Sequence, residues 1–139
     1  MDFSRLIEIA NQADEFIKTM NETKEKYSNK INGYIKDLED LKNKNSVNST
    51  HYIQYKTKTT KENINKVLKT FNKKISDDIE ELKIWYDNQM LSIKIQIVKY
   101  QQAKLGIVIS DSAAKALAEN IPHPELSIPE FKINVPEIE

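Results

Sequence analysis

The sequence predicts an all-α fold: a long antiparallel helical hairpin of coiled-coil type, with an extended proline-containing C-terminal arm. Two long stretches repeat apolar residues every three or four positions, which is the period of a helix with one buried face. A short polar stretch separates them, and all four prolines lie within residues 121–139. The chain has 139 residues, two glycines and no cysteine, which excludes a disulfide scaffold, a cysteine zinc site and a thiol nucleophile.

The first predicted helix covers residues 2–44. Its apolar positions follow a seven-residue repeat in which Lys24 is the one polar member. The repeat comprises Phe3, Leu6, Ala10, Ala13, Ile17, Met20, Lys24, Tyr27, Ile31, Tyr34, Leu38 and Leu41. A polar turn follows at 45–50, where Ser49 or Thr50 is a suitable N-cap for the next helix.

The second predicted helix covers residues 51–105 and has an eleven-residue repeat, typical of a nearly straight helix. Its stripe comprises Ile64, Leu68, Phe71, Ile75, Ile79, Leu82, Tyr86, Met90, Ile93 and Ile97. With a turn near residue 47, residue i should face roughly residue 95 minus i. Because two such wide stripes cannot be covered by two helices alone, we expect an oligomer or a partner. One continuous rod remains an alternative to the hairpin.

Two alternatives concern the end of this helix. Residues 92–99 alternate apolar and polar side chains, which is also a strand pattern, although both flanks favour a helix. Gly106 is the expected helix stop, followed by a short helix over 111–120 that Ser110 or Asp111 would cap. The alternative is a helix that continues through Gly106 to Asn120.

The hairpin domain is therefore 1–120, and residues 121–139 form the arm. Proline excludes a helix there and favours extended backbone, so the arm can dock in a groove or at a sheet edge of a neighbouring subunit. The alternatives are an arm that folds back on its own helices and a disordered tail. The residues expected to bind the partner are Leu126, Ile128, Phe131, Ile133, Val135 and Ile138.

No pattern indicates catalysis, a metal site or a cofactor. His51 and His123 are 72 residues apart without an acidic residue at ligand spacing, and we interpret both as exposed surface residues. The serines have no accompanying histidine and aspartate pattern, and no phosphate-binding loop is present. We expect a non-enzymatic protein.

Charge is balanced overall, with 21 basic and 21 acidic residues, but it is unevenly distributed. Residues 42–74 carry nine lysines and one acid, so an anionic partner is a second possibility at the hairpin tip. The tip residues named for it are Lys56, Lys58, Lys61, Lys66 and Lys69. The alternative is a solvated surface that acidic residues of the facing helix neutralise. The near absence of arginine weakens a nucleic-acid interface.

The function expected from these features is that of a structural or assembly protein. The hairpin would act as a spacer and the arm would dock on a neighbouring subunit of a large complex, such as a phage or virus particle, by analogy with proteins of this build. The partners are then other protein subunits, including further copies of the chain. A polyanion- or membrane-surface-binding protein is the alternative, and a secreted protein that inserts helices into membranes is a third. The N-terminus has no signal-peptide pattern, which predicts the cytoplasm or a particle assembled there, and no transmembrane segment is expected.

Overall fold

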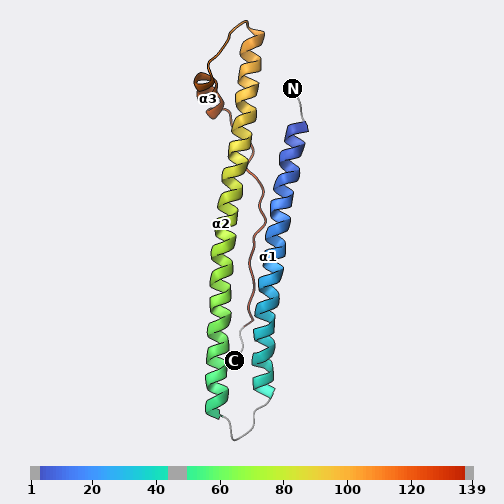
Figure 1. The fold of residues 1–139 in the computed structure, drawn as a ribbon, viewed down its shortest axis with the longest axis vertical. Helices are drawn as coiled ribbons and strands as arrows, with labels where there is room; N and C mark the ends of the chain where they lie inside the picture. The colour runs from blue at the N-terminus through green and yellow to red at the C-terminus, as the bar shows by residue number, and fades with distance from the viewer. Residues whose placement is uncertain (1–3, 44–49, 137–139) are drawn as a thin grey trace. The chain divides into compact units, whose positions relative to one another are not determined.

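The computed structural model describes residues 4–43 and 50–136. Within these residues the protein is all-helical, with α1 at Ser4–Asn43, α2 at Thr50–Lys104 and α3 at Asp111–Glu119, and no strand (Figure 1). The all-α class and the long helix pair are confirmed. Of the predicted turn at 45–50, residues 45–49 lie outside the described residues, including the candidate cap Ser49. The other candidate cap, Thr50, is the first residue of α2.

The helices contribute to two compact units. Unit 1 consists of Met1–Ile17 and Ile79–Pro129, and unit 2 consists of Lys18–Asp78 and Glu130–Glu139. In unit 2, α1 and α2 bury one apolar row each, and the rings of Tyr27 and Phe71 lie 5.5 Å apart. The buried residues of unit 2 are Met20, Ile31, Leu38, Ile64, Val67, Phe71, Ile75, Phe131 and Ile133. These are largely the residues of the two predicted stripes.

In unit 1, α1 and α2 run antiparallel. The Arg5 guanidinium donates to Gln89 Oε1 at 2.9 Å, close to the predicted pairing of residue 5 with residue 90. Further along α1, the ring of Phe16 lies 5.4 Å from that of Trp85. The first turns of α1 differ from the predicted stripe, because Ile9 is buried and Ala10 is exposed. A helix that packs at 3.6 residues per turn drifts away from a strict seven-residue repeat, and the larger side chain takes the buried position.

Residues 92–99 are helical, which decides the alternative between helix and strand. This part of α2 is apolar on two sides. Val98 belongs to a core with Leu91, Ile95 and α3, whereas Ile93 lines a separate hollow together with Leu6 of α1. The strand-like alternation therefore arises from a helix with neighbours on both sides.

Gly106 ends α2, as predicted, so the helix does not continue to Asn120. Its φ of +74° lies in the left-handed region that favours glycine. The amide of Gly106 donates to Ala103 O and that of Ile107 to Gln102 O, both at 3.0 Å. These two bonds are those of the Schellman motif, which satisfies the last helical carbonyls and reverses the chain. The reversal sends α3 back alongside α2 within unit 1 (Figure 1).

Candidate functional site

The C-terminal segment of unit 1 is positioned by α3. Ser110 caps α3, since its hydroxyl accepts from the amide of Ala113 at 3.3 Å. Ala114 and Ala118 are fully buried against Val98 of α2. Because alanine has only a methyl side chain, α3 can pack closely on α2, which fixes where the segment after α3 begins.

An ion pair also ties α3 to α2. Lys99 Nζ binds Asp111 Oδ1 in the first turn of α3. The hydrogen bond from Lys99, followed by its charge, lowers the pKa of the Asp111 carboxyl from 3.8. Asp111 is exposed, so solvent screens this pair and its contribution to stability is small.

Lys94 is the buried charged residue of unit 1, with 7% of its surface exposed. Its ammonium donates to the carbonyl of Ile121 at 2.7 Å and to Nδ1 of His123 at 2.9 Å. Both acceptors belong to the segment that follows α3. A buried ammonium needs such partners, because losing its hydration without them would cost several kcal/mol.

His123 connects this lysine to an acid on the same helix. Its Nε2 lies 3.0 Å from Asp87 Oδ1. An ammonium only donates hydrogen bonds and a carboxylate only accepts them. Nδ1 of His123 must therefore accept from Lys94 while Nε2 carries a proton toward Asp87, so the arrangement selects one neutral tautomer.

Tyr86 completes the contacts with the segment. Its ring meets that of His123 edge to face at 5.8 Å, and its hydroxyl donates to the carbonyl of Pro124 at 3.0 Å. Burial, and secondarily the charge of Asp87, raises the pKa of Tyr86 above 10.0, so the hydroxyl keeps the proton that it donates. We call Tyr86, Asp87, Lys94 and His123 the anchor cluster.

The anchor cluster lies in a hollow of about 580 Å³ in unit 1. Charged side chains of α2, α3 and the segment itself also line it, and these are Lys83, Glu119 and Glu125. The interpretation of His123 as an exposed residue is wrong, since 22% of its side chain is exposed and both ring nitrogens have partners. His51 is exposed as expected.

The anchor cluster was missed because its three members on α2 contact a segment that follows 29 to 38 residues later in the sequence. Two signals were available. Lys94 is the one charged residue in the apolar run from Met90 to Val98, and His123 is flanked by prolines that hold its neighbours in extended backbone.

The predicted arm residues lie in both units. Leu126 and Ile128 line the hollow of unit 1 and are half-buried. In unit 2, Phe131 and Ile133 are each only 8% exposed, and Val135 is half-buried. Ile138 lies outside the described residues. Lys132 and Asn134 are exposed, so alternate side chains of this stretch are buried.

The five lysines predicted at the tip are all exposed on α2 in unit 2. Among the described residues, none of the five forms an ion pair, although Lys56 Nζ lies 5.7 Å from the ring centre of Tyr52. Two neighbouring lysines do, since Lys73 pairs with Asp77 at 3.4 Å and Lys74 with Asp78 at 3.5 Å. In the part of the chain that the structure describes, the unpaired lysines are therefore Lys56, Lys58, Lys61, Lys66 and Lys69, and the paired lysines are Lys73 and Lys74.

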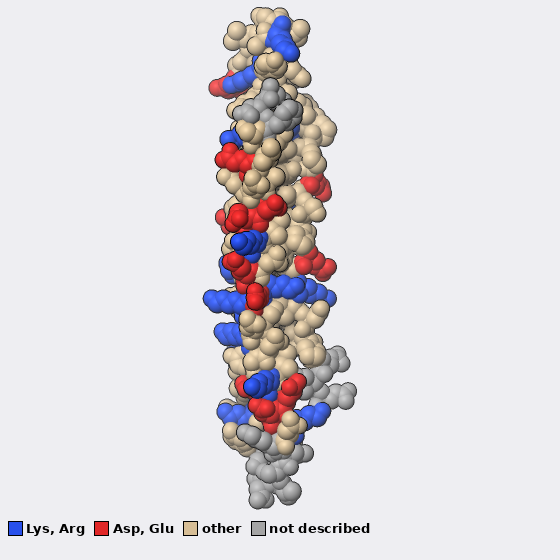
Figure 2. All heavy atoms as spheres, turned by 90° about the vertical axis from the view of Figure 1, so that its right-hand side faces the viewer, with Lys and Arg blue, Asp and Glu red and all other residues tan. Residues whose placement is uncertain are grey.

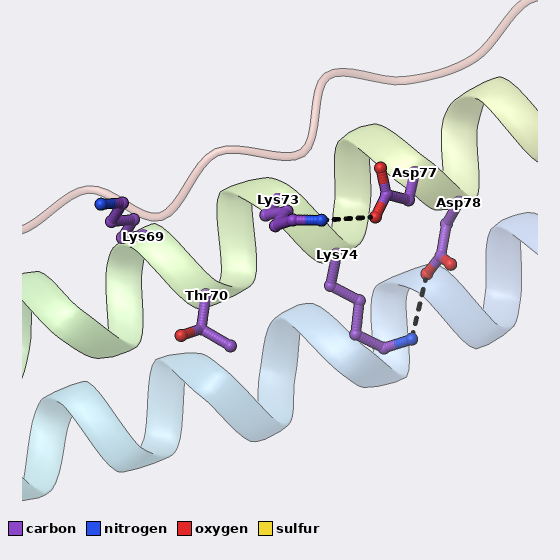
Figure 3. A pocket seen from close by; sticks show the side chains of 6 residues that line it. All are labelled: Lys69, Thr70, Lys73, Lys74, Asp77 and Asp78. Atoms are coloured by element: carbon purple, nitrogen blue, oxygen red, sulfur yellow. Dashed lines mark hydrogen bonds and ion pairs between the residues drawn. The ribbon is translucent and has the colours of Figure 1, made fainter.

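Figure 3 shows where the two sets of lysines meet, around a shallow hollow of about 430 Å³. Dashed lines join the two paired lysines to their aspartates, whereas Lys69 stands without a partner. On the face shown in Figure 2, acidic side chains lie among basic ones. Of the described lysines in residues 42–74, only Lys73 and Lys74 are thus paired with acidic neighbours.

Within residues 4–43 and 50–136, no group of three histidine or acidic side chains is placed to hold a metal ion. Across the same residues, no helix has a stretch long and apolar enough to cross a membrane. Comparison of the chain with protein-family models, curated proteins and solved structures found no significant match.

Proposed function

We propose that the protein is a non-enzymatic structural component of a larger assembly, and that its C-terminal arm docks on a neighbouring subunit. The proposal rests on the burial of Phe131 and Ile133 on unit 2, at a site that we call the seat. Both are buried against the long helices of unit 2, although the segment that bears them has no helix or strand. Side chains, rather than a backbone ladder, therefore hold this part of the arm.

The same seat is present in every copy of the chain. An arm that fills its own seat can instead fill that of a neighbour, with the same apolar contacts and little change in enthalpy. Such exchange of an identical element is a low-cost route to oligomers. In the assembled state the arm would then link subunits, and the long helices would set the spacing between them.

Exposed apolar residues support association as well. In unit 1, large apolar side chains remain exposed around the end of α2, namely Tyr100, Leu105, Ile107 and Val108, and Val108 is fully exposed. Several large apolar side chains exposed close together in the chain favour an interaction site.

The test replaces both seated residues with aspartate, as Phe131→Asp with Ile133→Asp. The control places the same two carboxylates on the exposed side of the same segment, as Lys132→Asp with Asn134→Asp, and also removes the positive charge of the lysine. Light scattering at pH 7.5 over a range of concentrations should give a multiple of 16.2 kDa for the wild type and the control, and 16.2 kDa for the double variant. Circular dichroism should show that the helices persist in all three.

A wild-type monomer at every concentration would contradict the proposal. So would a double variant that keeps the wild-type mass, because the seat would then not be the interface.

The second candidate function is binding to a polyanion or an anionic surface through the unpaired lysines. The observation in its favour is that all five are exposed and without an ion pair among the described residues. Replacing Lys56, Lys58, Lys61 and Lys66 with glutamine should abolish retention on heparin. Replacing Lys73 and Lys74 should reduce it less, because those charges are already paired. Wild-type protein that is not retained at low salt would eliminate this function.

A further inference from the structure

A hollow in unit 1 lies where α2 extends beyond the described part of α1. Arg5, in the first turn of α1, contacts Gln89, whereas α2 continues to Lys104. Four residues of α2 that line the hollow follow each other at steps of four, three and four, so they share one face of the helix. They are Ile93, Ile97, Tyr100 and Lys104, and they span about 16 Å of α2 at 1.5 Å per residue. The apolar stripe of α2 therefore continues here as the wall of a hollow.

The wall of this hollow is apolar, and its mouth is open to solvent. Leu6 of α1 and Ile97 are half-buried, Ile93 is buried and Tyr100 is exposed. The volume is about 450 Å³, within the roughly 300–1,000 Å³ that is usual for small-molecule sites. We call it the end hollow and define it by these four residues together with Arg5 and Lys104, which also line it.

Both charged side chains that line the end hollow are basic, and among the described residues no acidic side chain lines it. Neither Arg5 nor Lys104 takes part in an ion pair between described residues. Arg5 donates one hydrogen bond to the neutral amide of Gln89, which leaves its charge uncompensated and most of its five donors available. Lys104 Nζ lies 4.8 Å from the ring centre of Tyr100, so the ammonium is held beside the apolar wall.

Apolar walls and uncompensated cations together indicate the chemical class of a ligand. A purely apolar molecule would leave the cations without a partner, and a cationic amphiphile would be repelled. A carboxylate head group fits Arg5, because a guanidinium can bond both carboxylate oxygens at once. An unbranched hydrocarbon chain fits a hollow that follows one helix over about 16 Å, and its burial provides the main driving force.

We propose that the end hollow binds one molecule of a fatty-acid-like amphiphile, with a single hydrocarbon chain and a carboxylate head. The chain would lie on Leu6, Ile93 and Ile97, and the carboxylate would bind the guanidinium of Arg5. Lys104 adds electrostatic attraction from the rim. None of these residues belongs to the arm, so the binding is independent of the docking proposed above.

Isothermal titration calorimetry at pH 7.5 tests the proposal with two probes of equal chain length. These are dodecanoate and dodecyltrimethylammonium, each below its critical micelle concentration. Dodecanoate should bind at one site per chain. The cationic probe should bind at least about tenfold more weakly, because both lining cations repel it. Added salt should weaken the binding of dodecanoate, since exposed charges are screened.

One pair of variants locates the hydrocarbon chain. Ile97→Asp places a carboxylate on the apolar wall and should weaken dodecanoate binding at least about tenfold. The matched control is Ile84→Asp, which changes an exposed isoleucine of α2 outside the end hollow. It should bind dodecanoate as the wild type does. Circular dichroism checks that the helices persist in both variants.

A second set of variants locates the head group. Arg5→Gln should weaken dodecanoate binding about three- to thirtyfold, the range for a charge-assisted bond that solvent partly screens. Arg5→Lys should weaken it less, because the positive charge is kept. Lys115→Gln removes an exposed lysine of α3 outside the end hollow and should leave the affinity unchanged.

A wild-type protein that does not bind dodecanoate, or that binds both probes equally, would overturn the proposal. Equal affinities of Ile97→Asp and Ile84→Asp would also overturn it, because the amphiphile would then adsorb without using the hollow. Sedimentation with phosphatidylglycerol vesicles, by a protein that does not bind monomeric dodecanoate, would assign the hollow to a membrane surface instead. If Ile97→Asp, but not Ile84→Asp, lowered the mass measured by light scattering without ligand, the occupant would be a second copy and the proposal would be wrong.

Discussion

Replacing each of the two glycines with alanine should change the stability of the protein in opposite directions. Gly33 lies within α1, and a Cβ built on it meets nothing within 4 Å. Gly106 likewise has open space around it, but its φ is +74°. Since neither alanine would clash, the sign of each effect is decided by the backbone alone.

The expected magnitudes follow from backbone conformation. Gly33→Ala should raise the free energy of unfolding by about 0.5–1 kcal/mol, because glycine loses more freedom than alanine when a helix forms. Gly106→Ala should lower it by roughly 1–2 kcal/mol, the cost of a side chain in the left-handed region. For a chain of this length, each kcal/mol corresponds to a shift of about 4 °C in Tm.

Thermal unfolding followed by circular dichroism at 222 nm measures both shifts, and urea titration gives the free energies. Gly106→Asn provides a check on the mechanism, since asparagine tolerates the left-handed region and should restore much of the lost stability. The reasoning would be refuted if Gly106→Ala were as stable as the wild type, or if both alanine variants shifted Tm in the same direction.

Two further predictions concern the contacts of α3. Ala118→Leu should destabilise the protein by about 1–3 kcal/mol in urea titrations, because the fully buried methyl group leaves no room for a larger side chain. The control Ala116→Leu, on the exposed side of α3, should leave the stability nearly unchanged. Equal effects of the two substitutions would mean that α3 is not packed as described. Lys99→Gln should raise the pKa of the Asp111 carboxyl toward 3.8 in an NMR titration. Because the pKa is lowered in the folded protein, the stabilisation from this pair is present above about pH 4 and is lost as the pH falls through the lowered pKa. An unchanged Asp111 titration would show that the pair does not form in solution.

The helices could be predicted because their determinants are local. The apolar periods and the residues Ser110 and Gly106 specify where elements run and end, and the structure agrees with these boundaries to within about two residues over the described chain. The register of Arg5 with Gln89 followed from loop geometry alone. The first turns of α1 show the limit of a strict seven-residue repeat. The repeat predicts that Ala10 is buried, but the structure buries Ile9, because a helix with 3.6 residues per turn gradually departs from a seven-residue period.

The anchor cluster could not be predicted in the same way. Its contacts depend on the angle at which α3 returns along α2, and that angle is set by the packing of Ala114 and Ala118 rather than by a periodic pattern. Lys94 within an apolar run was a sign of a buried partner, but only the fold identifies His123 and the carbonyl of Ile121 as its acceptors.

The reversal at Gly106 has a consequence for the order in which unit 1 folds. After it, the pairs join residues progressively further apart in sequence: Lys99 with Asp111 at a separation of 12, Lys94 with His123 at 29, and Tyr86 with Pro124 at 38. Once one pair has formed, the loop that the next pair must close is shorter. The segment can therefore pack onto α2 progressively, starting next to Gly106, with a small loss of entropy at each step. The contact of Arg5 with Gln89 closes a loop of 84 residues, and none of these earlier pairs shortens that loop. The C-terminal half of unit 1 should therefore form first and present α2 already supported on one side when α1 arrives.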